Sequence, residues 1–252
     1  MFVARAPRRL VGLLLIASAA VRAQSQAPEA AHRQRIDGTG LKAGQFVYQT
    51  TLERDAGTTV LGTRTVTVSP TTYAGGPAWL VLETRTGGGI GAIDSLFADR
   101  TSLRAVHWSS TLGEARLAAE FRGDTMYVGL TSPAGRRSMT STVPGGSLIS
   151  AGMLETMLRL VPLETAWEDS ATTLSVSLGG STVLPTRIAV IGDDRVRVPA
   201  GEFDCWVVAV HADPARGLYW VTKHDPVVVR SALDVPALGG AQLVNALTRS
   251  SP

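Results

Sequence analysis

Cysteine and lysine are scarce in this chain of 252 residues. Cysteine occurs once, at Cys205, so a scaffold held together by internal disulfides is excluded. Cys205 lies within a dense run of apolar residues, and we interpret it as a buried small hydrophobic side chain rather than a nucleophile. Lysine occurs only at Lys42 and Lys223, a bias that we attribute to genome composition.

The sequence also lacks the short motifs that mark common catalytic and cofactor sites. It contains no Gly-x-Ser-x-Gly elbow, no P-loop and no pair of histidines at metal-ligand spacing. The glycine-rich stretch 87–91 is not followed by a helical pattern, which argues against a dinucleotide site. We therefore predict no cofactor and no metal, and we assign no catalytic residue.

A hydrolase with catalytic residues dispersed along the chain remains an alternative. It would require a polar cleft in which His107, His211 or His224 meets carboxylates. Asp213 lies close to His211 in sequence and Asp225 follows His224, but such pairs are typical of solvated turns. The sequence therefore leaves enzymatic activity undecided and favours its absence.

An excess of positive charge is confined to the N-terminus. Residues 1–23 hold Arg5, Arg8, Arg9 and Arg22 and no acidic side chain, whereas the other residues comprise 20 basic and 21 acidic side chains. The sequence pI of about 9.4 therefore indicates neither a nucleic-acid partner nor binding to an anionic membrane surface.

Residues 1–23 have the pattern of a cleaved signal peptide. Arginines precede the apolar run Leu10–Val21, and small residues precede Gln24 at the expected cleavage positions. The run is short for a hydrocarbon core of about 30 Å, and no later segment is long and apolar enough for a second span. We predict an exported protein without a stable transmembrane anchor, periplasmic, with the extracellular space as the alternative.

The remaining chain is organised for β-structure. Residues 24–43 are polar and aperiodic and are interpreted as a flexible leader. From residue 44 apolar and polar side chains alternate, most clearly in 115–122, and glycine-rich turns separate the runs. This pattern predicts an all-β fold, a curved antiparallel sheet or incomplete β-barrel, in one domain at 44–250. A weak internal sequence similarity suggests two similar β units, about 44–143 and 163–250.

One helix is predicted near residues 150–161. Ser150 can cap its start, Pro162 ends it, and apolar residues recur between them at helical spacing. We expect this helix to pack on the sheet rather than to bind a membrane or a partner.

Several predicted strands are apolar on both faces, notably 78–82 and 203–210. Either a second layer covers the outer face, or a curved sheet encloses an apolar ligand cavity. In the second case, aromatic side chains of the strands would line the cavity. The candidate ligand-binding residues are Trp79, Phe97, Trp108, Phe121, Trp206 and Trp220.

The segment 198–203 has the pattern of a structural hairpin. Pro199 ends the preceding strand because it cannot donate a ladder hydrogen bond, and Gly201 can adopt the positive φ of a tight turn. Phe203 then enters the core, and Val198 is the last residue of the preceding strand.

This motif, followed by Tyr219–Val221, Lys223 and Asp225, resembles a family of uncharacterised exported bacterial β-rich domains. The resemblance extends to Asp99–Arg104 and to Val161–Leu163. The family is distantly similar to the half-barrel lipoprotein carriers of the Gram-negative periplasm, so the resemblance implies a half-barrel and an envelope compartment. It has no agreed activity and transfers no catalytic residue.

We therefore hypothesise a cell-envelope protein that binds an apolar or lipid-like ligand without catalysis. A solid interior with no concavity would contradict this hypothesis. The alternative from another class is a structural or protein-interaction module of the envelope, which predicts an exposed apolar patch or sheet edge.

Overall fold

The computed structural model describes residues 36–87, 91–143, 151–177, 180–235 and 238–252. They form fourteen β-strands, a short 3-10 helix (Gly38–Gly40) and one α-helix, α1 (Ala151–Leu158). The predicted signal peptide, residues 1–23, and the predicted helix cap, Ser150, lie outside the described residues. None of the helices in the described ranges is long and apolar enough to cross a bilayer.

Eight strands precede α1 in the chain and six follow it. The first eight are β1 (Gly44–Arg54), β2 (Gly57–Tyr73), β3 (Gly76–Thr86), β4 (Ala92–Asp99), β5 (Ala105–Leu112), β6 (Ala115–Arg122), β7 (Thr125–Ser132) and β8 (Gly135–Thr142). The other six are β9 (Glu168–Ser177), β10 (Gly180–Val198), β11 (Gly201–Ala212), β12 (Ala215–Thr222), β13 (Val228–Val235) and β14 (Ala241–Ser251).

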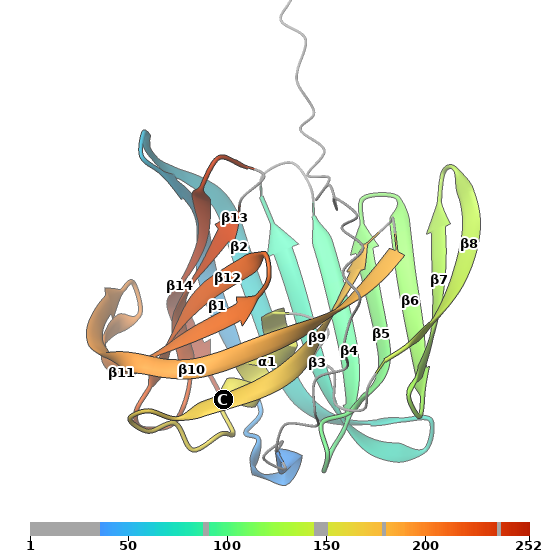
Figure 1. Cartoon of the computed structure of the whole chain (residues 1–252), viewed down its shortest axis with the longest axis horizontal. Helices are drawn as coiled ribbons and strands as arrows, with labels where there is room; N and C mark the ends of the chain where they lie inside the picture. The colour runs from blue at the N-terminus through green and yellow to red at the C-terminus, as the bar shows by residue number, and fades with distance from the viewer. Residues whose placement is uncertain (1–35, 88–90, 144–150, 178–179, 236–237) are drawn as a thin grey trace, which may run out of the picture.

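All of these strands belong to one antiparallel sheet. Strands β1 to β8 pair consecutively, as do β9 to β14, and β1 pairs with β14 in the middle of the sheet. The two edges are β8 and β9, so the barrel is not closed. Figure 1 shows the strong curvature, with the long β10–β11 ribbon running steeply across the direction of β3 to β7. The prediction of an incomplete, all-β barrel with one helix is confirmed.

Local sequence alternation explains why individual strands form. In β6, Leu117 and Ala119 are buried, whereas their neighbours Arg116 and Ala118 are exposed. This is the side-chain period of two expected for a strand with one covered face. The alternation identified from the sequence therefore corresponds to real burial.

Helix α1 covers one face of the sheet, here called the inner face. Residues Gly152–Leu158 of the helix are all buried, and Leu158 is completely so. A cavity of about 10 Å³ lies between α1 and β1–β2, lined on the sheet side by Phe46, Tyr48, Val66 and Val68. Helix α1 therefore packs on the inner face of the sheet, as predicted, but it ends at Leu158, four residues before the predicted end at Pro162.

A buried ion cluster ties α1 to this inner face. Arg64 of β2 donates from Nη1 and Nη2 to the two carboxylate oxygens of Glu155 on α1, at 2.8 and 3.0 Å. Its Nη2 also donates to Glu83 of β3 at 2.9 Å, and Glu83 in turn pairs with Arg85. All three side chains, Arg64, Glu83 and Glu155, are buried, so each charge is matched where water cannot solvate it.

Strand β11 is covered on both of its faces. Cys205 and Val208, which point to opposite sides of the strand, both have no exposed surface. The tip of the β10–β11 hairpin reaches β14, where the Ala200 amide donates to the Leu247 carbonyl at 3.0 Å. The apolar character of both faces of this strand thus reflects coverage by the protein's own elements.

Residues 36–43, the described end of the predicted leader, contact the sheet. The Gly38 amide donates to the Thr101 carbonyl at 2.7 Å, and the Trp79 indole donates to the Gly38 carbonyl at 2.9 Å. Leu41 is buried in the core. This segment therefore packs beside the turn between β4 and β5.

Candidate ligand-binding pocket

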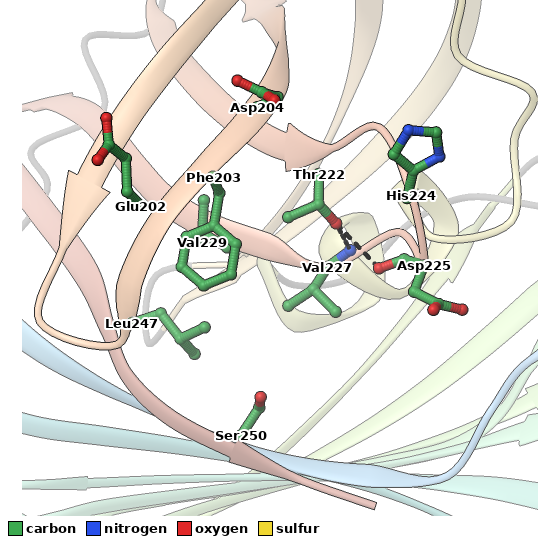
Figure 2. Close-up of a pocket in the computed structure, with 10 residues that line it drawn as sticks. All are labelled: Glu202, Phe203, Asp204, Thr222, His224, Asp225, Val227, Val229, Leu247 and Ser250. Carbon is green, nitrogen blue, oxygen red and sulfur yellow. Dashed lines mark hydrogen bonds between the residues drawn. The ribbon is translucent and has the colours of Figure 1, made fainter.

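A pocket of about 320 Å³ opens at one end of strands β11 to β14. Its apolar lining consists of Phe203 and Val227, which are half-buried, and of Val229 and Leu247, which are buried. Its polar lining consists of Glu202, Asp204, Thr222, His224, Asp225 and Ser250. Figure 2 shows Phe203, Val229 and Leu247 gathered together, with the carboxylates of Glu202 and Asp204 turned away from them. The volume lies at the lower end of the range for small-molecule sites.

The β10–β11 hairpin places Phe203 in this apolar lining. Val198 pairs with Gly201 across the turn, and Gly201 has a φ of 142°, which is open to glycine. The hydrogen bond from the Ala200 amide to Leu247 fixes the hairpin tip beside β14. The segment singled out in the sequence therefore forms a hairpin whose aromatic residue lines the pocket.

The short connection between β12 and β13 forms another side. The Thr222 hydroxyl donates to the Asp225 carbonyl and accepts from the Val227 amide, both at 2.9 Å (Figure 2). The Thr222 amide also donates to the Val227 carbonyl at 3.0 Å. These hydrogen bonds fix the position of Val227, which follows a tight turn, in the lining of the pocket.

The carboxylates around the pocket are paired with basic side chains. Lys42 lies 2.7 Å from Asp225, and this hydrogen bond holds the pKa of Asp225 below its usual value. Arg195 lies 3.0 Å from Glu202, and Arg197 also contacts Glu202 at 3.5 Å. The pocket therefore combines an apolar wall with a rim in which most of the negative charge is already neutralised.

Three of the six predicted aromatic residues belong to the inner face. Trp79 and Trp108 are buried there, and the strand register places Phe121, which is half-buried, on the same face. Arg100 lies 5.2 Å over the Trp79 ring. These residues pack in the core or at its margin, and none of them lines the pocket.

The other three aromatic residues occupy separate places. Phe97 lies on the outer face beside Tyr73, with their ring centroids 4.6 Å apart. Lys223 lies 4.3 Å over the Trp206 ring, and the Trp220 indole donates to Asp194 at 3.2 Å. The structure therefore distributes the six candidates over several environments, and the pocket wall uses Phe203 instead.

One histidine–carboxylate pair is present on the outer face. His107 Nδ1 lies 2.8 Å from Glu120, which also accepts a hydrogen bond from the Tyr73 hydroxyl at 2.9 Å. The imidazole stacks against Tyr73. Among the described residues, no serine, threonine or cysteine hydrogen-bonds to this imidazole, and no three metal-ligating side chains converge. This arrangement is an aromatic and polar surface cluster.

Sequence reasoning missed most of the pocket wall. Val227, Val229 and Leu247 belong to segments that read as ordinary buried strands. Their only sequence signal is apolar character, which core residues share. Phe203 was identified, but as a structural hairpin residue rather than as a pocket residue.

Comparison with known proteins identifies the family. Residues 45–240 match the family described as "Protein of unknown function (DUF3108)". The chain belongs to this family. Among proteins with curated functions, none matches the chain.

A solved structure supports the fold of this DUF3108 protein. A β-barrel-like protein of the DUF1849 family from Brucella abortus aligns with a TM-score of 0.51 and 13% identity, covering 84% of this chain and 98% of its own. A DUF1329 protein from Desulfovibrio piger aligns with a TM-score of 0.26 and 9% identity, covering 84% and 86%. The first supports a shared fold alone, and the second is too distant to support any argument.

Proposed function

We propose that this DUF3108 protein is an exported envelope protein that binds a small apolar or lipid-like ligand without catalysis, in the pocket beside β11–β14. The observation that supports the proposal is a pocket of about 320 Å³ whose wall comprises Phe203, Val227, Val229 and Leu247. Burial of hydrocarbon against such a wall stabilises a complex by about 0.8 kcal/mol per methylene group.

The proposed site differs from the aromatic cavity expected from the sequence. Helix α1 packs on the concave face of the sheet, and the cavity between it and β1–β2 holds about 10 Å³. The larger space lies at the end of the β11–β14 strands. Export to the periplasm is part of the same proposal and is supported by the signal-like sequence of residues 1–23.

Titration with a neutral fluorescent probe, N-phenyl-1-naphthylamine, tests the proposal. We expect saturable binding with one site per chain. Ser250→Trp should weaken binding at least tenfold because Ser250 is exposed at the pocket and an indole would occupy it. The matched control is Ser138→Trp, on the exposed face of β8, which should bind the probe as the unchanged protein does.

Two results would contradict the proposal. Absence of saturable binding by the unchanged protein would exclude an accessible apolar pocket. Equal binding by the Ser250→Trp and Ser138→Trp variants would show that the probe binds elsewhere.

A protein-interaction module is the second candidate, because the sheet ends at two edges, β8 and β9. Sheet edges are templates for pairing with another strand. Failure of probe binding together with concentration-dependent self-association or cross-linking through β8 or β9 would favour this candidate.

A further inference from the structure

One end of strands β4 to β8 carries a row of side chains on the outer face of the sheet. Strand pairing aligns one residue from each of these five strands: Ile93, Thr111, Arg116, Thr131 and Arg136. Directly paired residues of antiparallel strands point to the same face. That face is the outer one, because Arg116 is exposed whereas its neighbour in β6, Leu117, is buried in the core.

The arginines at this end of the sheet have no acidic partner. Arg116, Arg136 and the adjacent Arg137 are exposed, and none of them forms an ion pair within the described ranges. By contrast, the exposed Arg187 and Arg195 of β10 lie 2.7 and 3.0 Å from glutamates. The guanidinium groups at the end of β6–β8 are therefore available to an external anion.

The acidic side chains of residues 105–142 leave this positive charge in place. Glu120 lies 2.8 Å from His107, and Asp124 pairs with Arg104 at 3.5 Å. The third acidic residue of this range is Glu114, in the turn between β5 and β6. Three arginines therefore share one glutamate at this end, although residues 24–252 as a whole are nearly neutral.

Two large apolar side chains are exposed at the same end. Ile93 of β4 is 52% exposed, and Leu112, the last residue of β5, is 48% exposed. They are close to each other because Leu112 pairs with Ala92, the neighbour of Ile93. Thr111 separates Ile93 from Arg116 in the row, so the apolar and cationic side chains form one continuous surface.

This combination matches the interface of a lipid bilayer. Aliphatic side chains can enter the boundary between head groups and acyl chains, while arginine places its apolar stem along that boundary and its guanidinium at the lipid phosphates. A nucleic acid or an acidic polysaccharide would match the arginines but would leave the two aliphatic side chains in water. The exposed Ile93 and Leu112 therefore favour a lipid surface.

We propose that this end of β4–β8 binds the surface of an anionic lipid bilayer. The docking surface consists of Ile93, Leu112, Arg116, Arg136 and Arg137. It is separate from the pocket beside β11–β14, so the inference goes beyond the proposed function and stands without it. The balanced charge of the sequence gives no sign of this surface, because strand pairing is what gathers the arginines.

Co-sedimentation with lipid vesicles tests the proposal. The chain from Gln24 onward is used, because the arginines and apolar run of residues 1–23 would bind vesicles by themselves. We expect binding to vesicles of phosphatidylcholine mixed equally with phosphatidylglycerol, and much weaker binding to phosphatidylcholine alone. Binding should fall steeply between about 0.01 M and about 1 M salt, since the screening length shortens from about 30 Å to about 3 Å.

The double variant Arg116→Gln with Arg136→Gln locates the cationic part of the surface. Each arginine near an anionic bilayer contributes about a fivefold change in affinity, so the two changes together should weaken binding about 25-fold. The matched control, Arg216→Gln with Arg249→Gln, removes two exposed arginines from β12 and β14. It changes the net charge equally and should bind as the unchanged protein does.

Ile93→Ala locates the apolar part. We expect it to weaken binding about fivefold, because part of the side chain is withdrawn from water on docking. Ile191→Ala makes the same change at a residue of β10 that is 61% exposed, and should have no effect. In the unchanged protein, vesicles should slow hydrogen exchange in residues 109–117 and 130–138 and leave β12 unaffected.

Three results would overturn the proposal. The first is absence of binding to the mixed vesicles at low salt. The second is equal weakening in the two arginine double variants, which would mean that net charge alone governs binding. The third is arginine-dependent binding of dextran sulfate, an anionic polymer without an apolar part, together with no effect of Ile93→Ala on vesicles, which would assign the surface to a polyanion.

Discussion

The pKa of a buried glutamate in this protein is raised or lowered according to the charges around it. Burial alone would raise the pKa of Glu83, but the neighbouring Arg64, with Arg85, outweighs burial and holds that pKa below its usual value. Burial dominates at Glu155 and raises its pKa even though Arg64 binds both of its oxygens. Two glutamates of one cluster are thus shifted in opposite directions by the balance of desolvation and attraction.

The two glutamates should therefore give opposite pH dependences of stability. The contribution of Glu83 is fully present above its unfolded pKa of about 4.3 and is lost as the pH falls through its lower folded pKa. Ionisation of Glu155 penalises the folded state as the pH rises from about 4.3 through its raised folded pKa. In urea denaturation between pH 3 and pH 8, the Glu83→Gln variant should lose less stability toward acid pH than the unchanged protein does. The Glu155→Gln variant should lose less stability toward alkaline pH than the unchanged protein does.

The slopes, rather than the absolute stabilities, are compared, because both variants also lose a contact with Arg64. Ser138→Ala, at an exposed position of β8, changes no titratable group and serves as the control, which should leave both slopes unchanged. Identical slopes for the two glutamine variants would contradict the assignment.

At the scale of elements, α1 depends on the sheet that it covers. A helix of eight residues is too short to be stable in isolation. Seven consecutive residues, Gly152–Leu158, are buried, so the helix is stabilised by packing around its circumference rather than along one stripe. Thr156 donates to the Gly152 carbonyl at 2.7 Å, which satisfies a hydroxyl that could not reach water.

Leu158→Ala should test how much this packing contributes. Leu158 has no exposed surface, so we expect a loss of about 2–5 kcal/mol in the free energy of unfolding. Leu112→Ala, on β5, makes the same chemical change at a residue that is 48% exposed, and should cost less than about 1 kcal/mol. Urea denaturation of both variants gives the comparison, and equal losses would show that α1 is not an integral part of the core.

The whole molecule is organised by the pairing of its first and last strands. Strands β1 and β14 lie in the centre of the sheet and join the group β1–β8 to the group β9–β14. Asn245 of β14 accepts from the Thr50 hydroxyl at 2.8 Å and donates to the Ser231 hydroxyl at 3.1 Å, which ties three neighbouring strands at this junction. The core is likewise one cluster that includes residues of both groups.

We therefore expect the two strand groups to unfold together. Hydrogen exchange measured by mass spectrometry at increasing urea should show β2–β4 and β11–β13 losing protection at the same urea concentration. Loss of protection in β9–β14 at a clearly lower concentration would instead indicate two independent β units.

The sequence by itself determined the elements of this protein and their class. Alternation of apolar and polar residues, as in β6, is a local property of the sequence, and so are the helical spacing before Pro162 and the glycine turn at Gly201. Each pattern can be recognised without knowledge of the rest of the chain. It also excluded internal disulfides, since only Cys205 is present.

Only the tertiary structure decided which side chains meet. Arg64 and Glu155 are 91 positions apart, and the pocket wall combines Phe203, Val229 and Leu247 from three strands. Such contacts depend on strand register and sheet curvature, and a shift of the pairing register by one residue would turn each side chain of a strand to the opposite face. For that reason the sequence could list aromatic residues as pocket candidates, while the fold placed α1 in the concavity and formed the open pocket elsewhere.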